Sequence, residues 1–148
     1  GSGINYDIRK NNSYEVYDNF SFEIPIGSNG DSYDRTIVRM KETLESIKII
    51  EQVLGSLPEG ALCSRKPLKS AKLLKPPKGS HYKAIESPRG ELGFFIVSDG
   101  SSMPYRMKIR APSFSNLSIV EKLLPGTYIA DAVVILGSLD PVFGDFDR

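Results

Sequence analysis

The sequence is poor in the residues that most often bind metals, with one cysteine, Cys63, and one histidine, His81, among 148 residues. One cysteine cannot form an intramolecular disulfide, which fits a reducing compartment. It cannot supply the four thiolates that an iron–sulfur cluster usually needs, and together with His81 it falls short of the four ligands of a structural zinc site. We therefore expect this chain to bind no metal or iron–sulfur cofactor of its own.

Long apolar runs, a strong charge of one sign and standard enzyme motifs are also missing. The longest apolar run, residues 132–136, is far shorter than the roughly 20 residues of a membrane span. The formal net charge of +1 argues against a dedicated nucleic-acid-binding protein. Because no phosphate-binding loop or nucleophile motif occurs, composition indicates only a globular chain of about one domain.

Residues 1–30 are expected to form a lead-in of strand and loop. Apolar side chains alternate with other residues across 20–26, which predicts a half-buried strand, and Pro25 favours the edge of a sheet. The alternating apolar residues are Phe20, Phe22, Ile24 and Ile26.

A long amphipathic helix is expected over residues 31–55. Asp31 or Ser32 caps its start, while Gly55 and Pro58 end it. Its apolar residues follow one stripe at steps of three, four and seven, and such a stripe is expected to pack on another element. The stripe consists of Tyr33, Ile37, Met40, Leu44, Ile47 and Leu54.

Residues 61–85 are expected to form a basic loop, and residues 87–110 a β hairpin. Prolines and glycines interrupt the basic residues of the loop, which favours a solvated loop over contact with an acidic partner or nucleic acid. Alternating apolar residues on both sides of Asp99 and Gly100 predict the hairpin. Its return strand alternates apolar with basic residues, a charge pattern that discourages edge pairing, although it can also bind phosphate.

Residues 113–148 are expected to form two helices and a tail. A short helix capped by Ser115 or Ser118 precedes a helix over residues 128–136, which is apolar nearly all round and is therefore expected to be deeply buried. Asp131 lies inside this helix, and a buried carboxylate needs a backbone or arginine partner unless it is functional. Because helices and strands do not alternate strictly, the pattern predicts an α+β fold.

Two short strings carry unusual chemistry. Residues 87–93 (Ser-Pro-Arg-Gly-Glu-Leu-Gly) hold Arg89 between proline and glycine at the mouth of a hairpin. There Arg89 either points into a cavity as a fixed cation and hydrogen-bond donor or pins its own turn. Residues 139–148 keep apolar side chains where a chain end normally frays, so we expect this tail to dock inward.

These strings, with others in order along the chain, resemble the quinone-side catalytic subunit of respiratory complex I, NADH:quinone oxidoreductase. The matching runs lie at residues 1–10, 25–35, 87–93, 105–114 and 140–148. The resemblance covers essentially the whole chain and corresponds to the carboxyl-terminal part of that subunit. It implies part of a hydrogenase-large-subunit-like fold, since the quinone-side subunit is similar to the large subunit of nickel–iron hydrogenases.

The hydrogenase comparison implies a nickel site that has lost its ligands. Those enzymes end in Asp-Pro-Cys-x-x-Cys-x-x-His, in which the two cysteines bind nickel. In this chain Asp140 and Pro141 match the first two residues. The cysteine positions become Val142 and Asp145, and the histidine position becomes Arg148. Val142 has no donor atom and Arg148 stays protonated, so the soft thiolate ligands are gone.

The resemblance also implies which residues lie near the quinone. Asp140, Val142 and Arg148 are expected close to the quinone and the iron–sulfur cluster. Arg89 matches the hydrogenase arginine that lies over the metal, and with Asp145 it is expected to line or brace the cavity. In the family the histidine and tyrosine that hold the quinone lie in the amino-terminal part of the subunit. This chain is therefore expected to hold no catalytic residue and to be inactive alone.

The resemblance implies an oxidoreductase in which electrons from NADH reach quinone, coupled to proton translocation. The implied partners are the iron–sulfur partner subunit, the amino-terminal part of the quinone-side subunit, and the other peripheral-arm and membrane-arm subunits, with no nucleic acid. The implied location is the cytoplasmic face of a bacterial inner membrane or the matrix face of the mitochondrial inner membrane. Two alternatives stay open: a related dehydrogenase fed by ferredoxin or another donor, or a membrane-bound hydrogenase relative; and a non-redox interaction module.

Overall fold

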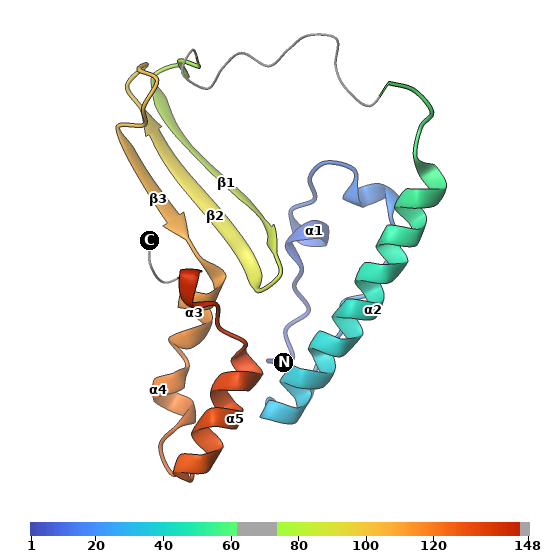
Figure 1. Ribbon diagram of the computed structural model, residues 1–148, viewed down its shortest axis with the longest axis vertical. Helices are drawn as coiled ribbons and strands as arrows, with labels where there is room; N and C mark the ends of the chain where they lie inside the picture. Colours follow the sequence, from blue (N-terminus) through green and yellow to red (C-terminus); the bar gives the residue numbers. More distant parts are fainter. Residues whose placement is uncertain (62–73, 146–148) are drawn as a thin grey trace.

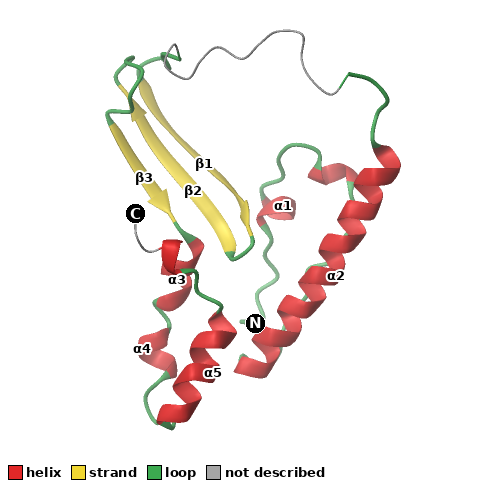
Figure 2. Ribbon diagram, viewed as in Figure 1, coloured by secondary structure: helices red, strands yellow, loops and turns green. Residues whose placement is uncertain are grey.

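The computed structural model describes residues 1–61 and 74–145 of the chain. It combines helices with a three-stranded antiparallel sheet, which confirms the predicted α+β class. Figure 1 shows the long helix α2 on the right, the sheet at the upper left, and a group of short helices below the sheet. Figure 2 shows the amino-terminal segment, mostly loop, running between α2 and the sheet. Cys63, Arg148 and residues 62–73 of the expected basic loop lie outside the described residues.

Helix α2 (Ser32–Ser56) forms where the sequence predicts a long helix. The Asp31 carboxylate accepts a hydrogen bond from the Asp34 N–H at 2.7 Å and caps the first turn. The Asp34 carboxylate accepts hydrogen bonds from the backbone N–H groups of residues 28–30. These bonds, above all the one from Asn29, hold the pKa of the Asp34 carboxyl below its ordinary value. These hydrogen bonds hold the loop at residues 28–30 against the first turn of α2.

The apolar stripe of α2 faces away from the elements that this chain packs on the helix. Tyr33, Met40 and Leu44 are 70%, 61% and 59% exposed. The buried residues of α2 are instead Val38, Glu45 and Ile49, which project on the other side of the helix at 100° per residue. The stripe that the sequence marks for packing is therefore largely exposed, although Ile37 is half-buried and Leu44 borders a cleft with residues 23–26.

The strand expected over residues 20–26 is wrong, because this segment is extended but pairs with no strand in the part of the chain that the structure describes. Its backbone is satisfied by side chains of α2 instead. The Gln52 side chain accepts from the Ser21 N–H and donates to the Ser21 carbonyl, both at 2.8 Å. The Glu45 carboxylate accepts from the Glu23 N–H at 2.8 Å. Two short helices, α1 (Ile8–Asn11) and η1 (Tyr17–Asn19), precede this segment.

The sheet has three strands rather than two. Strands β2 (Gly90–Ser98) and β3 (Arg106–Arg110) form an antiparallel pair around the expected turn. Strand β1 (Gly79–Ser87) pairs with β2 from the other side, so the expectation of a loop is wrong for residues 79–85. Its alternation is weak in apolar residues, which hid the strand from a search by hydrophobic period.

The carboxyl-terminal region contains three helices and a final turn. They are α3 (Pro112–Leu117), α4 (Val120–Leu123), α5 (Ile129–Leu139) and η3 (Phe143–Asp145). The deep burial expected for the last helix is wrong within this chain, because Ile129 is 93% exposed and Val133 is 74% exposed. Asp131 is exposed as well, and its carboxylate accepts a hydrogen bond from the Tyr128 N–H at 3.4 Å, a capping role.

The buried apolar residues are few and come from several separate elements of the chain. They are Ile8, Phe22, Val38, Ile49, Ala111 and Ile135. Gly93 in β2 leaves room for the Tyr82 ring to pack on the strand, because a Cβ at position 93 would lie 2.3 Å from the Tyr82 hydroxyl. Among the described residues no helix is long and apolar enough to cross a membrane.

Replacing Gly93 by alanine is expected to lower the free energy of unfolding by about 1–3 kcal/mol, because the Tyr82 ring must leave its place over the strand. The loss should shrink when Tyr82→Ala is also present. Gly137→Ala is the matched control, since nothing lies within 4 Å of the Cβ that alanine would add there and alanine favours a helix interior by roughly 0.5–1 kcal/mol. Urea denaturation checks every variant, and equal stability of the two alanine variants would contradict the packing of Tyr82 on Gly93.

Candidate functional site

The carboxyl end of α5 is the point where helix, sheet and tail meet. Asp140 adopts φ 51° and ψ 54° there, in the left-handed region, directly after the helix. The following Pro141 disfavours a right-handed helical conformation for Asp140, and aspartate tolerates the left-handed one better than most residues. The Asp140 N–H donates to the carbonyls of Leu136 and Gly137, both at 3.2 Å. The Asp-Pro pair therefore ends the helix with a sharp corner.

Two arginines of α2 bind the last turn of α5. Arg35 Nε donates to the Ser138 hydroxyl at 2.9 Å, and Arg39 donates to the Ser138 carbonyl at 2.6 Å. Arg39 Nε also lies 3.6 Å from the Asp140 carboxylate. The last carbonyls of a helix lack partners within the helix, and its carboxyl end carries partial negative charge. Arg39 supplies a donor to one of these carbonyls, and both guanidinium groups place positive charge at this end of the helix.

Arg89 reaches the same corner from the sheet. It lies in the turn between β1 and β2, where Pro88 fixes one backbone angle and Gly90 takes a φ of 135° that favours glycine. Arg89 Nε lies 2.9 Å from the Asp140 carboxylate and 3.0 Å from the Asp140 carbonyl oxygen. Both side chains are about one third exposed, so the ion pair itself contributes modestly, roughly 0–1 kcal/mol.

Ser113 at the start of α3 fixes the tail beyond the corner. It is 1% exposed, and its hydroxyl donates to the Asp145 carboxylate at 2.8 Å. The same oxygen accepts a hydrogen bond from the Val142 N–H at 3.2 Å. The backbone of Val142 is thus held while its side chain stays 38% exposed.

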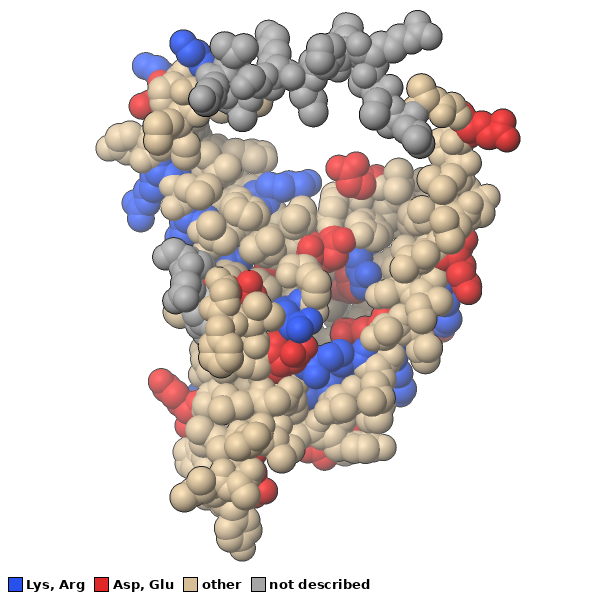
Figure 3. Space-filling view, in the orientation of Figure 1, with Lys and Arg blue, Asp and Glu red and all other residues tan. Residues whose placement is uncertain are grey.

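An open groove of about 1310 Å³ lies between α2 and the side of the chain formed by the sheet and α3. Arg35, Arg39 and Arg89 line it, together with acidic residues such as Glu42. Figure 3 shows basic and acidic side chains gathered in this hollow. Burial raises the pKa of the Glu42 carboxyl above its ordinary value. Charged side chains of α2 therefore share the groove with apolar ones, among them Val38, Ile49 and Ile50.

The structure brings together four of the five residues that the sequence marks for the site. Asp140, Val142 and Asp145 lie along one short tail, and Arg89 contacts it from the sheet. Arg89 also lines the groove, whereas the three tail residues do not. The fifth residue, Arg148, lies outside the described residues.

Sequence reasoning missed four residues of this corner, which are Arg35, Arg39, Ser113 and Ser138. The two arginines carried a usable signal, because they lie four residues apart on the helix face away from the apolar stripe. The two serines carried none, since a serine at a helix end or in a turn is ordinary.

The donor set at the corner does not suit nickel. Val142 offers no coordinating atom, and the Asp145 carboxylate is hydrogen-bonded to Ser113. Across residues 1–61 and 74–145, no cluster of three or more histidine, cysteine or acidic side chains could hold a metal ion.

The fold is that of a component of a respiratory membrane complex. The chain aligns with a solved structure of an archaeal membrane-bound sulfane sulfur reductase with a TM-score of 0.88 and 39% identity, covering 99% of this chain and 40% of that one. All 148 residues match the family described as respiratory-chain NADH dehydrogenase, 49 kDa subunit, and the chain belongs to this family.

Curated relatives agree with the family match. The chain is 52% identical over 148 residues to an NADH-quinone oxidoreductase subunit of Herpetosiphon aurantiacus, covering 40% of that protein. It is 50% identical over 147 residues to the corresponding NADH-quinone oxidoreductase subunit of Bacillus cereus, covering 39% of it. The chain thus spans about two fifths of the length of the curated relatives that it matches.

Replacing Ser113 by alanine is expected to release the tail, because the Val142 N–H and the Asp145 carboxylate both lose a partner. The cost should be about 1–3 kcal/mol, and amide hydrogen exchange at Val142 should accelerate. Ser115→Ala is the matched control, since that hydroxyl donates to the preceding helical turn at the Ala111 carbonyl. Unchanged exchange at Val142 in Ser113→Ala would show that the hydroxyl does not hold the tail.

Proposed function

We propose that this chain is part of the quinone-reduction module of a proton-translocating NADH:quinone oxidoreductase. In this role it forms one wall of the pocket where electrons from NADH reach quinone, coupled to proton translocation. The family match over residues 1–148 and the names of the curated relatives support this role. The structural observation that supports the proposed pocket wall is the Arg89–Asp140 contact, which joins the sheet to the corner at the end of α5.

The residues of the corner have distinct tasks under this proposal. Arg89 supplies a fixed cation next to the pocket, and a fixed cation favours the negative charge that develops on a substrate oxygen during reduction. Asp140 holds the guanidinium in place. Val142 presents an apolar surface to the quinone, and Asp145 braces the tail through Ser113.

We propose that other parts of the complex supply the iron–sulfur cluster and the groups that bind the quinone. The electrons come from an iron–sulfur cluster carried by an iron–sulfur partner subunit, and this chain supplies no ligand to that cluster. The quinone is gripped by groups in the remaining, amino-terminal part of the quinone-side subunit. The other peripheral-arm and membrane-arm subunits complete the enzyme, and the chain lies peripherally at the cytoplasmic or matrix face of the membrane.

A second candidate is a related complex fed by another electron donor such as ferredoxin. The specific observation in its favour is the 39% identity and TM-score of 0.88 to a chain of a sulfane sulfur reductase, a respiratory membrane complex that is not named as an NADH-quinone oxidoreductase. The curated relatives, at 48–52% identity, favour the NADH-fed enzyme. Assays of the assembled complex with NADH and with reduced ferredoxin separate the two. Stoichiometric nickel or hydrogen uptake would instead indicate a hydrogenase.

Enlarging Val142 is expected to alter the response to inhibitors of the quinone site. In the assembled complex, Val142→Met should shift the half-inhibitory concentration at least severalfold, because a larger side chain changes the shape of the pocket wall. Val16→Met is the matched control, at an exposed valine in the amino-terminal segment. Identical inhibition curves for wild type and Val142→Met would refute the placement of this residue at the quinone.

Removing the guanidinium of Arg89 is expected to lower kcat for quinone reduction about tenfold or more, since a preorganised cation is worth roughly 1–3 kcal/mol to charge that develops in the reaction. Arg89→Lys should recover part of the rate, because it keeps the charge but not the planar donor geometry. Arg110→Ala, which removes a basic side chain from strand β3, serves as the control. Equal kcat in Arg89→Ala and wild type would exclude a role for this cation.

A further inference from the structure

Two glutamates face each other across the hairpin beside the turn between β1 and β2. Glu86 of β1 and Glu91 of β2 are directly paired in the antiparallel register. Like charges directly opposite each other destabilise a pair of strands, so each carboxylate needs hydrogen-bond donors of its own. Tyr6 and Tyr82 donate to the Glu91 carboxylate at 3.2 and 3.1 Å, and Tyr17 donates to the Glu86 carboxylate. Neutral hydroxyl donors thus allow two carboxylates to lie side by side next to the turn.

Glu86 receives its hydrogen bonds from the amino-terminal segment. Its Oε1 accepts from the Tyr17 hydroxyl, whereas its Oε2 is buried and has no hydrogen-bond partner in the part of the chain that the structure describes. The Glu86 N–H, on the free edge of β1, donates to the Tyr14 hydroxyl at 3.0 Å. A buried carboxylate oxygen without a donor costs free energy. The Tyr17 hydroxyl is therefore the group that keeps this carboxylate in place among the described residues.

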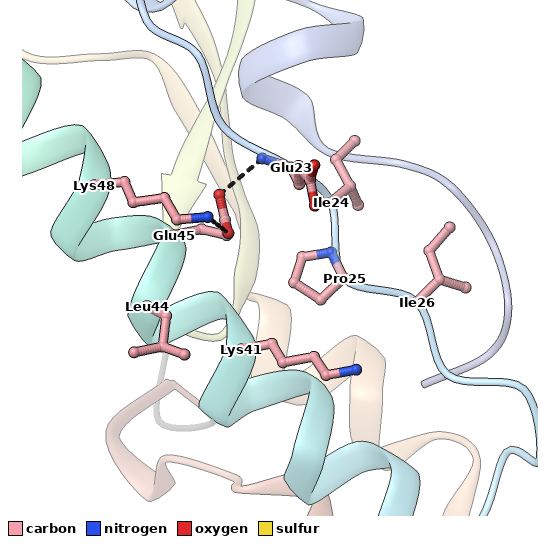
Figure 4. Close-up of a pocket in the computed structure, with 8 residues that line it drawn as sticks. All are labelled: Glu23, Ile24, Pro25, Ile26, Lys41, Leu44, Glu45 and Lys48. Carbon is pink, nitrogen blue, oxygen red and sulfur yellow. Dashed lines mark hydrogen bonds and ion pairs between the residues drawn. The ribbon is translucent and has the colours of Figure 1, made fainter.

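The Tyr17 ring is held by its own neighbours. The Tyr14 ring meets it edge to face, with the ring centroids 5.3 Å apart, and the Arg9 guanidinium lies 6.0 Å from its centroid. A few residues further along the chain, the Glu23 N–H donates to the Glu45 carboxylate and fixes the segment to α2 (Figure 4). The position of the Tyr17 hydroxyl is therefore set with respect to α2.

We propose that Tyr17 is a positioning residue for Arg89, because through Glu86 it holds the turn between β1 and β2. Glu86 lies three residues before Arg89, and Pro88 between them restricts the backbone, so a displaced Glu86 moves the guanidinium away from Asp140. Helix α2 contacts Asp140 directly through an arginine. It thus places both partners of the Arg89–Asp140 contact, the carboxylate directly and the guanidinium by way of the amino-terminal segment. This role of Tyr17 rests on the proposed function of Arg89 in quinone reduction.

In the complete complex, Tyr17→Phe is expected to lower kcat for quinone reduction about fivefold, because the Glu86 carboxylate loses its donor. KM for quinone should stay nearly constant, since Arg89 acts on charge that develops during the reaction. Tyr105→Phe is the matched control, because it removes the hydroxyl of a tyrosine that is 76% exposed in the connection between β2 and β3. A wild-type kcat in Tyr17→Phe, where Arg89→Ala lowers kcat, overturns the positioning role and leaves the proposed function intact.

Combining Tyr17→Phe with Arg89→Ala separates positioning from a general loss of structure. If Tyr17 acts through Arg89, its replacement has no further effect on kcat once the guanidinium is gone, whereas independent effects would add. Glu86→Gln keeps an oxygen that accepts from the Tyr17 hydroxyl and should retain more of the rate than Glu86→Ala. Additive effects in the double variant, or equal rates in the two Glu86 variants, overturn the proposal.

Amide hydrogen exchange, followed by mass spectrometry of the complete complex, tests the positioning without using the activity. Peptides that contain residues 86–91 should exchange faster in Tyr17→Phe than in the wild type, and at the wild-type rate in Tyr105→Phe. If Arg89→Ala leaves kcat unchanged, the proposed function of that cation fails, and hydrogen exchange alone then decides whether Tyr17 holds the turn. Unchanged exchange in Tyr17→Phe overturns the positioning role at any rate of quinone reduction.

Discussion

The convergence of three guanidinium groups on the end of α5 is the interaction on which the arrangement of this chain depends. Arg35 and Arg39 come from α2, and Arg89 comes from the turn between β1 and β2. Their targets are one helical terminus and the carboxylate that follows it. Because a helix end needs donors from outside the helix, a single terminus can join three elements. No continuous apolar core performs this task among the described residues, since the buried apolar residues are few and dispersed.

Helix α2 explains how a chain with so small a core keeps a defined shape. Its inward face carries arginines, Glu45 and Gln52, and these bind the end of α5 and the extended segment before the helix. Its apolar stripe points the other way. Hydrogen bonds give this inward face its register, because a donor and an acceptor must meet within about 0.5 Å of an ideal distance. Val38 and Ile49 add apolar burial, which is less directional, on this inward face, whereas most of the outward stripe is exposed.

The sequence allowed prediction of local structure better than of burial. The one-sided apolar stripe predicted α2, and Asp99 with Gly100 predicted the pairing of β2 and β3, because both signals are local. The strand expected over residues 20–26 failed because alternation shows that a segment is extended, not that a neighbouring strand exists. The burial expected for the last helix was wrong within this chain, because an apolar surface indicates that the helix needs a packing partner but not which segment supplies it.

In the candidate site, too, some residues could be predicted from the sequence and others could not. The family pattern singled out Asp140, Val142, Asp145 and Arg89, and all four lie at one corner. Arg35, Arg39 and Ser113 are not part of that pattern. The spacing of the two arginines on one face of α2 could have marked them, but their partners at the end of α5 lie about 100 residues away and cannot be read from local sequence. Side chains that bind backbone can keep a corner in place while the side chains presented by that corner change.

Because the side chains that hold the corner differ from those that it presents, one fold can carry either a metal site or a quinone site. The geometry of the corner depends on the arginines and on Ser113, and none of these occupies a position that corresponds to a nickel ligand. Under the resemblance to nickel–iron hydrogenases, exchange of the thiolates for Val142 and Asp145 would remove the metal chemistry without removing the support. Arg39 and Arg89 lie beside the Asp140 carboxylate, Arg35 binds the Ser138 hydroxyl, and the Asp145 carboxylate accepts from Ser113. The three guanidinium groups of the corner thus outnumber its two carboxylates by one, which leaves it with a net positive charge. A positive, apolar-fronted wall suits an uncharged acceptor that becomes more negative as electrons arrive, which is the electrostatic requirement of the proposed quinone pocket.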